Sequence, residues 1–108
     1  MTLNELVKTN NASVRTKAFI TYDSKKKFLA DNEMLKNYSD EFIELLKQLK
    51  NVFSITVNAT AYNHIVITMY HSKTKSYEYI ACDCSTYDCT SFDSVKAAKQ
   101  YINEQINK

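Results

Sequence analysis

Apolar and polar side chains alternate along residues 52–60. The apolar set is Phe53, Ile55, Val57 and Ala59, and the polar set between them is Ser54, Thr56, Asn58 and Thr60. A period of two places the two sets on opposite faces of a β-strand, so the pattern predicts a half-buried strand with Phe53 on its apolar face. Half-buried strands are typical of an antiparallel sheet with one face toward solvent.

Two more strands are predicted directly after this one. Apolar residues recur at Ile65, Ile67 and Met69, and residues 77–84 are rich in aromatic and small apolar side chains. The connections are short and polar, with turns predicted at residues 62–64 and 72–75. Three consecutive strands with short connections indicate an antiparallel meander.

Helices are predicted on both sides of the meander in the sequence. Ser39 is a favoured N-cap followed by two acidic residues, and a last helix begins at Asp93, which is also a favoured N-cap. Apolar residues follow at helical spacing, at Phe42, Leu45, Leu46 and Leu49 in the first helix and at Val95, Ala98, Tyr101, Ile102 and Ile106 in the second. Each helix therefore has one apolar stripe, and a three-stranded sheet needs such a cover to be stable.

The pattern before Ser39 is less regular. Residues 2–8 predict a short helix because Thr2 and Glu5 have capping-box spacing. Residues 14–22 predict a strand, and residues 23–27 predict a turn or the start of a helix. Residues 28–36 are compatible with a strand or with a helical turn, and their spacing slightly favours the helix.

These elements predict a single α+β domain that spans residues 1–108. We expect an antiparallel β-meander of three or four strands, with the helices packed on one face. A chain of 108 residues is long enough to bury a core without disulfides or metal ions.

The amino-acid composition excludes several kinds of chemistry. The chain contains no glycine and no proline, whereas average usage would give about seven and five per hundred residues. Glycine-rich phosphate loops, dinucleotide-binding fingerprints and nucleophile elbows therefore cannot occur. The abundant lysine, asparagine, isoleucine and tyrosine have AT-rich codons, which indicates a low-GC bacterium or its phage as the source.

Charge and hydropathy limit the partners and the location. The net charge is +2, and Arg15 is the single arginine among 14 basic residues, which gives weak support to sequence-specific nucleic-acid binding. No apolar run approaches the roughly 20 residues of a membrane span, and residues 1–5 lack a secretory pattern. We therefore expect no membrane association and a cytoplasmic location in a bacterial host cell.

Cys82, Cys84 and Cys89 form the most distinctive cluster, and His71 ends the neighbouring strand. Three thiols and an imidazole suit a tetrahedral zinc site, but the spacing C-x-C-x4-C is not a familiar zinc pattern. The alternatives are a disulfide that includes Cys89, or free thiols, which are favoured for an odd number of cysteines in a reducing cytosol. We therefore predict neither a metal nor another cofactor.

No catalytic residues are predicted. Nucleophilic catalysis needs a base beside the nucleophile, and His64 and His71 are the only histidines. Cys89, His71 and Asp88 contain the required groups, but no known motif surrounds them. Both histidines fit solvated positions, His64 in a turn and His71 at a strand end, so we expect a protein that is not an enzyme.

Tyrosines supply the candidate binding site. If Ile65, Ile67 and Met69 face the helices, the neighbouring tyrosines face the other side of the sheet, next to lysines at the hairpin tip. The predicted partner-binding residues are Tyr70, Lys73, Lys75, Tyr77 and Tyr79. Tyrosine offers a large contact area at low entropic cost, which favours recognition. The alternative, that these tyrosines only stabilise the sheet as cross-strand pairs, has equal support.

Four features together resemble a known class of proteins. They are the capped helix at Ser39, the meander at residues 52–84, the closing helix from Asp93, and the absence of glycine and proline. In size and style the chain resembles the small proteins that phages and mobile elements use against host defence, anti-CRISPR proteins among them. No motif carries this resemblance. It implies a non-enzymatic inhibitor or adaptor that binds a larger host protein or ribonucleoprotein complex, such as a CRISPR effector nuclease. The alternative function is a nucleic-acid-binding accessory protein that uses the lysines and tyrosines of the sheet.

Overall fold

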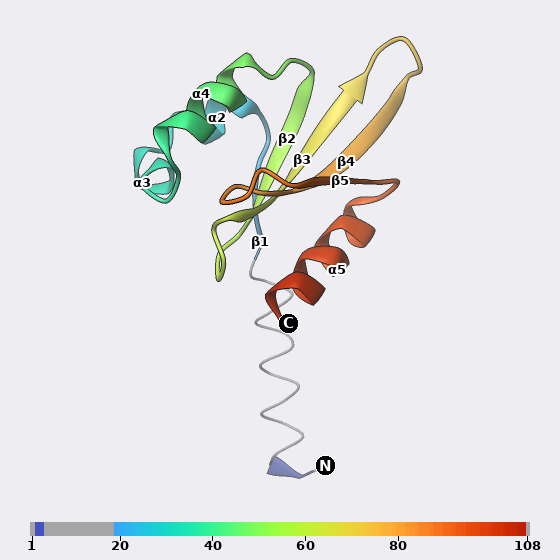
Figure 1. The fold of residues 1–108 in the computed structure, drawn as a ribbon. Coiled ribbons are helices and arrows are strands. Elements are labelled where there is room, and N and C mark those ends of the chain that lie inside the picture. Colours follow the sequence, from blue (N-terminus) through green and yellow to red (C-terminus); the bar gives the residue numbers. More distant parts are fainter. Residues whose placement is uncertain (1, 4–18, 108) are drawn as a thin grey trace.

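The computed structural model describes residues 2–3 and 19–107 of the chain, and within them a five-stranded antiparallel sheet forms the centre of the fold (Figure 1). The strands are β1 (Phe19–Tyr22), β2 (Val52–Asn58), β3 (His64–His71), β4 (Ser76–Asp83) and β5 (Cys89–Phe92). Their order in the sheet is the same as their order in the chain, and every neighbouring pair is antiparallel. The predicted α+β class and the meander are therefore confirmed, with five strands in place of three or four.

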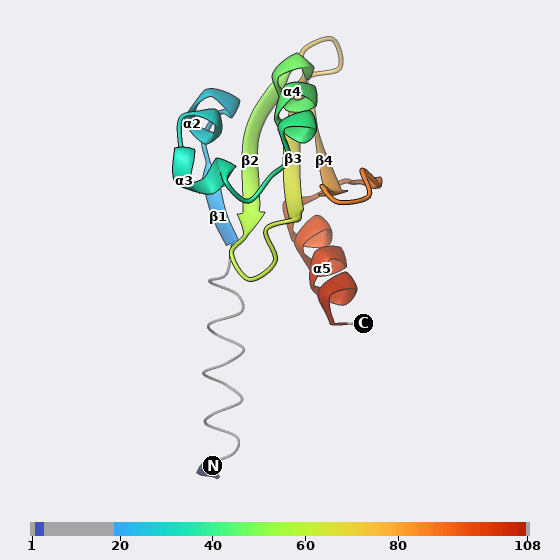
Figure 2. The same ribbon diagram turned by 60° about the vertical axis from the view of Figure 1, so that its left-hand side comes forward.

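Helices cover both faces of the sheet (Figures 1 and 2). They are α2 (Lys25–Leu29), α3 (Asn32–Leu35), α4 (Asp40–Gln48) and α5 (Val95–Ile106). The first three pack on one face and α5 packs on the other, because two separate clusters of buried side chains join them to the strands. Residues 4–8 of the helix predicted at residues 2–8, and residues 14–18 of the predicted strand, lie outside the described residues.

The larger cluster lies under α2, α3 and α4. Phe28, Phe42 and Leu46 pack here against the apolar face of the central strands, and Ile55 and Ile65 have no exposed surface. Each helix begins with a side chain that accepts a hydrogen bond from the backbone of its first turn, at Ser24, Asp31 and Ser39. The ambiguous residues 28–36 are thus mainly helical, as their spacing slightly favoured, and the Ser39 cap is confirmed.

The position of α5 corrects the expectation that all helices pack on one face. Val66 and Ala81 are buried on the face of the sheet that is opposite to the face of Ile65 and Ile67. They pack there against Ala98 and Ile102 of α5. The physical reason is visible in β3, where residues 65–67 are apolar on successive positions rather than on alternate ones. A strand that is apolar on both faces needs a cover on both sides.

Two side chains of the predicted apolar faces are exposed instead. Phe53 is 53% exposed because the pairing of β2 with β3 shifts by one residue between Val52 and Ser54. This β-bulge leaves Phe53 without a cross-strand partner and turns it away from the face of Ile55. Leu45 is 48% exposed, because it lies at the margin of the stripe that Phe42 and Leu46 form on α4.

Turns are made without glycine. Among the residues that the structure describes, three have a positive φ angle: Asn51 (66°), Lys75 (53°) and Tyr87 (65°). Asparagine tolerates this left-handed conformation at Asn51, two residues after the Leu49 cap of α4. Lysine and tyrosine are uncommon there, so the two hairpin turns that contain Lys75 and Tyr87 adopt strained backbone angles.

Candidate protein-binding surface and polar pocket

Four aromatic side chains gather on the α5 side of the sheet, beyond the N-terminal end of α5. We call them the aromatic patch, and they are Phe53, Tyr70, Tyr77 and Tyr79. Tyr77 is the centre of the patch, with its ring centroid 5.1 Å from that of Phe53, 5.0 Å from Tyr70 and 6.5 Å from Tyr79. Tyr77 is 45% exposed and Phe53 is 53% exposed, so the patch presents apolar surface to solvent.

The strand register explains how the patch forms. Tyr70 and Tyr77 are directly opposite each other in the β3–β4 ladder, and Tyr79 follows Tyr77 on the same face. Cross-strand aromatic neighbours contact one another at this spacing. The prediction that Tyr70, Tyr77 and Tyr79 share one face is confirmed. Phe53 was missed, and the only sequence signal for it is the pair of adjacent apolar residues at the start of β2.

The β3–β4 hairpin carries two lysines at its tip, next to the patch. In Figure 1 this hairpin extends from the sheet at the end remote from α5. Lys73 and Lys75 are exposed there, and neither makes an ion pair with any described residue. The turn is held by a 2.6 Å hydrogen bond between the hydroxyls of Thr74 and Ser76. All five predicted binding residues therefore lie close together.

A hollow of about 330 Å³ separates the patch from α5. Its lining consists of Thr21, Phe53, Ser54, Thr56, Thr68, Tyr77, Tyr79, Val95 and Lys99. A second hollow of about 490 Å³ lies further along α5 and shares Val95 and Lys99 with the first. The two hollows are neighbours along α5, on the side of that helix that meets the sheet, and we call them together the α5 groove. Sequence reasoning did not find it, because it depends on where α5 packs.

The α5 groove is positively charged. Lys96 and Lys99 are the only charged side chains among the residues that line its two hollows. The Lys99 ammonium lies 5.2 Å from the centroid of the Phe19 ring, a cation–π contact that holds the lysine beside the groove. A partner that enters this groove must therefore be neutral or negatively charged where it meets α5.

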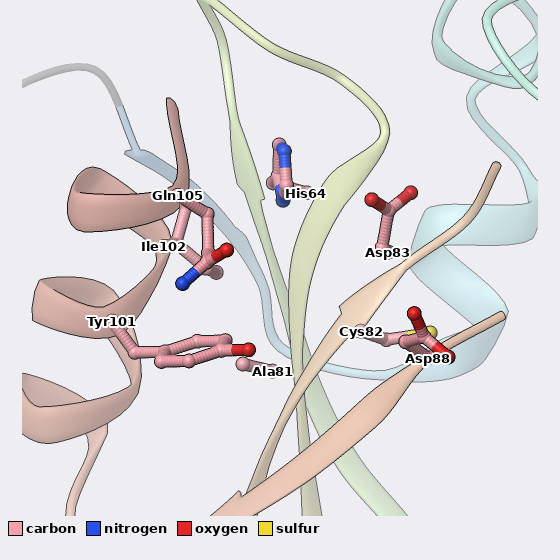
Figure 3. Close-up of a pocket in the computed structure, with 8 residues that line it drawn as sticks. All are labelled: His64, Ala81, Cys82, Asp83, Asp88, Tyr101, Ile102 and Gln105. Atoms are coloured by element: carbon pink, nitrogen blue, oxygen red, sulfur yellow. The ribbon is translucent and has the colours of Figure 1, made fainter. Parts of the chain in front are cut away.

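A small polar pocket lies between the C-terminal half of α5 and the end of β4 (Figure 3). Its lining consists of His64, Ala81, Cys82, Asp83, Asp88, Tyr101, Ile102 and Gln105. Figure 3 shows the Gln105 amide and the Tyr101 ring extending from α5 toward the strands, with both aspartates on the far side. The volume is about 80 Å³, which is room for a few water molecules but not for a typical small-molecule substrate.

Asp83, one of the two aspartates that line this pocket, is held in its ionised form. Burial raises the pKa of Asp83, but hydrogen bonds from Ser85 and Asn63 outweigh that effect and leave the pKa below its usual value. Asp83 is therefore a fixed acceptor for the turn at residues 84–87 and not a proton donor at neutral pH. His64 lies in the same pocket, but no hydrogen bond joins it to another described side chain.

The structure does not assemble the catalytic or zinc groupings considered above. Cys82 pairs with Ile65 in the β3–β4 ladder, so His71 lies six residues away along β3, or roughly 20 Å. His71 instead contacts Glu78 at 2.9 Å, and Ser91 donates a 2.8 Å hydrogen bond to the same carboxylate. These two bonds, Ser91 first, hold the pKa of Glu78 below its usual value. Among the described residues, no group of three or more His, Cys, Asp or Glu side chains is arranged to hold a metal ion.

No family model matches this chain, and neither a curated protein nor a solved structure is significantly similar to it. In the part of the chain that the structure describes, no helix has the length and apolar character needed to cross a membrane.

Proposed function

We propose that this protein acts without catalysis, by binding another protein through the aromatic patch and the lysine-bearing hairpin tip. The observation that supports this most directly is the exposed pair of rings at Phe53 and Tyr77, which contact each other at 5.1 Å between centroids. Clustered aromatic side chains with a charged rim are characteristic of recognition surfaces. Scattered single exposed apolar residues would not carry this meaning.

Covering the patch would contribute favourable energy to the binding of a partner. An aromatic side chain buries roughly 150–250 Å² when it is fully enclosed, and about half of the Phe53 and Tyr77 surface is exposed. Covering one such ring therefore removes on the order of 100 Å² from water, which is worth about 2–3 kcal/mol. Two rings and their neighbours supply the apolar centre of an interface, and Lys73 and Lys75 supply its rim.

The class of partner follows from the resemblance to phage and mobile-element proteins. That resemblance favours a larger host protein or ribonucleoprotein complex in the bacterial cytoplasm, and a CRISPR effector nuclease is the first partner to test. In this reading the protein is an inhibitor that occupies the surface of the host complex. A direct assay measures cleavage of target DNA by a purified effector nuclease as the concentration of this protein is raised.

Binding is tested with a double variant, Tyr70→Ala with Lys73→Glu, against the partner captured from a host lysate. We expect its affinity to fall by more than about 2 kcal/mol, or about 30-fold, because it removes an aromatic anchor and reverses a rim charge. The matched control is Tyr62→Ala with Lys26→Glu, which makes the same chemical changes at exposed positions outside the patch. Equal affinities for the two double variants would exclude the patch as the binding surface.

A nucleic-acid-binding accessory function is the second candidate, and the α5 groove is the observation that favours it. Lys96 and Lys99 line this groove beside exposed aromatic rings, and single-stranded nucleic acids bind surfaces that combine lysines with stacking platforms. A labelled single-stranded oligonucleotide would then bind with an affinity that falls steeply as salt is raised. The small net charge and the single arginine of the chain favour the protein partner.

A further inference from the structure

Two cysteines face each other across the edge of the sheet. Cys82 on β4 and Cys89 on β5 are direct partners in the antiparallel ladder. The next pair outward is Asp83 and Asp88, where the Asp83 N–H donates to the Asp88 carbonyl at 2.9 Å. Hydrogen-bonded and non-hydrogen-bonded pairs alternate along an antiparallel ladder, so the Cys82–Cys89 pair is a non-hydrogen-bonded one.

A non-hydrogen-bonded pair has the geometry that a disulfide needs. The Cα atoms of such a pair are about 4.5 Å apart, and the two side chains project from the same face. Disulfides join cysteines whose Cα atoms are about 4.4–6.8 Å apart. The two thiols can therefore be joined without moving either strand.

Cys84 is less well placed to pair with either of the other two cysteines. It follows Cys82 by two residues on the same strand, which separates their Cα atoms by about 6.6 Å, at the upper limit for a disulfide. Cys84 lies beyond the last pair of the β4–β5 ladder, in the turn at residues 84–88. It is therefore a diagonal neighbour of Cys89, and diagonal neighbours are about 7–8 Å apart. The ladder thus selects Cys82 and Cys89.

The environments of the two thiols differ. Cys89 is exposed, whereas Cys82 is only 6% exposed. Hydrogen bonds from the thiols of Cys84 and Cys89 lower the pKa of Cys82 to about 7, whereas burial and the contact with Cys82 raise the pKa of Cys89 to about 11. Cys82 therefore supplies a thiolate near neutral pH, which is the nucleophilic form of cysteine.

We infer that Cys82 and Cys89 form a redox modification site, at which hydroperoxides convert the two thiols into a reversible cross-strand disulfide. A hydroperoxide transfers one oxygen atom to one of the two sulfurs, which gives a sulfenic acid and releases water or an alcohol. The other sulfur then attacks the sulfenic sulfur, so that the S–S bond forms and the S–O bond breaks. The hydroxide that leaves takes up the proton lost by the attacking thiol, and a second water is formed.

This step is balanced in atoms and electrons. The two thiols lose two electrons and two protons together, and one hydroperoxide is reduced by two electrons. A dithiol reagent reverses the modification by thiol–disulfide exchange. The product joins the edge strand β5 to β4 and closes the turn at residues 84–88, which contributes Asp88 to the wall of the polar pocket.

The chain offers a direct test, because an endoproteinase that cleaves before aspartate places each cysteine in its own peptide, at residues 40–82, 83–87 and 88–92. The folded full-length protein is treated with hydrogen peroxide, its remaining thiols are blocked with N-ethylmaleimide, and the digest is analysed by mass spectrometry. We expect peptide 40–82 linked to peptide 88–92, with a loss of two hydrogen masses that dithiothreitol reverses. The blocked thiols should fall from three to one.

Variants decide between the three thiols. Cys84→Ser should retain the link between peptides 40–82 and 88–92, whereas Cys89→Ser should abolish it. Cys89 is exposed, so its replacement by serine should leave the near-ultraviolet circular dichroism spectrum of the fold unchanged. A link from peptide 83–87 to either neighbour in the wild-type protein, or peroxide treatment that leaves all three thiols free, would overturn the inference.

Discussion

The two faces of the sheet are built differently. The face under α2, α3 and α4 is covered by large side chains, among them Phe28, Phe42 and Leu46, that meet isoleucines and valines of the strands. The face under α5 has a smaller buried cluster of Val66, Ala81, Ala98 and Ile102. Because α5 begins only at Val95, the aromatic patch beyond it stays partly exposed.

In the proposed function, this difference separates stability from recognition. The face of α2–α4 buries most of the large apolar side chains, so it carries most of the hydrophobic stabilisation. The other face has a smaller fully buried cluster, with partly buried side chains such as Phe92 and Tyr101 packed against it, and side-chain contacts such as the 3.1 Å hydrogen bond between Thr21 and Thr56. A surface that contributes little to folding can carry binding residues that change without unfolding the protein.

The largest effect is expected in the centre of the α2–α4 face. Leu46→Ala should lower the free energy of unfolding by about 2–5 kcal/mol, because Leu46 is 2% exposed and its loss leaves a cavity. The measurement is chemical denaturation followed by circular dichroism. Leu45→Ala is the matched control on the same helix, and at 48% exposure it should cost much less. Similar midpoints for the two variants would refute the packing of α4 on the sheet.

The α5 face should respond to added volume. Ala98→Leu should lower the free energy of unfolding by about 1–3 kcal/mol, because Ala98 has no exposed surface and a larger side chain must push α5 off the strands. Gln100→Leu is the control, at an exposed position on the same helix. If Ala98→Leu were as stable as the control in thermal unfolding, α5 would not pack against Val66 and Ala81.

The sequence predicted the elements well and their packing less well. The Ser39 cap and the helical stripes located α4 and α5, and the alternation at residues 54–58 located β2, since both depend on local spacing. The predicted cap of α5 was one residue too early, because Ser94 and not Asp93 accepts the hydrogen bond from its first turn. The second covered face was missed because alternation in β2 was extended to β3, although residues 65–67 are apolar at successive positions. The bulge at Phe53 was missed because it depends on pairing with β3.

Some parts of the candidate site could likewise be predicted from local spacing, whereas others depend on packing. Tyr70, Tyr77 and Tyr79 could be placed on one face from strand parity alone, because the β3–β4 ladder is regular from end to end. The α5 groove could not be predicted, since it needs the docking position of a helix that is distant in the sequence. The pairing of Cys82 with Cys89 needs the register of β5, which a strand of four residues does not reveal by periodicity.

Two half-buried tyrosines on the α2–α4 face differ in whether their hydroxyl groups are hydrogen-bonded. The Tyr22 hydroxyl donates a 2.7 Å hydrogen bond to Asp31, whereas the buried Tyr38 hydroxyl has no hydrogen-bond partner among the described residues. Tyr22→Phe should lower the free energy of unfolding by about 0.5–1.5 kcal/mol, and Tyr38→Phe should leave it unchanged or raise it. Thermal denaturation of both variants at neutral pH measures the difference.

The effect of Tyr22→Phe should also depend on pH. The hydrogen bond from Tyr22 is the largest cause that holds the pKa of Asp31 below its usual value of 3.8. A carboxyl group whose pKa is lowered by folding stabilises the fold above its unfolded pKa, and this contribution is lost as the pH falls through the folded pKa. The two proteins should therefore differ fully at pH 7 and converge below about pH 4. A difference that grew on acidification would contradict this assignment.

The smallest effect on stability is expected at the hairpin tip. Lys73→Glu should change the free energy of unfolding by less than about 0.5 kcal/mol, because Lys73 is exposed and makes no ion pair with the described residues. Lys75 is a poorer choice, since its φ angle of 53° mixes a backbone effect with the change of charge. The decisive comparison sets chemical denaturation beside the affinity for the captured partner. A variant with unchanged stability and lower affinity would support a binding role for the hairpin tip. A variant that unfolds at a lower denaturant concentration would show that the tip contributes to stability instead.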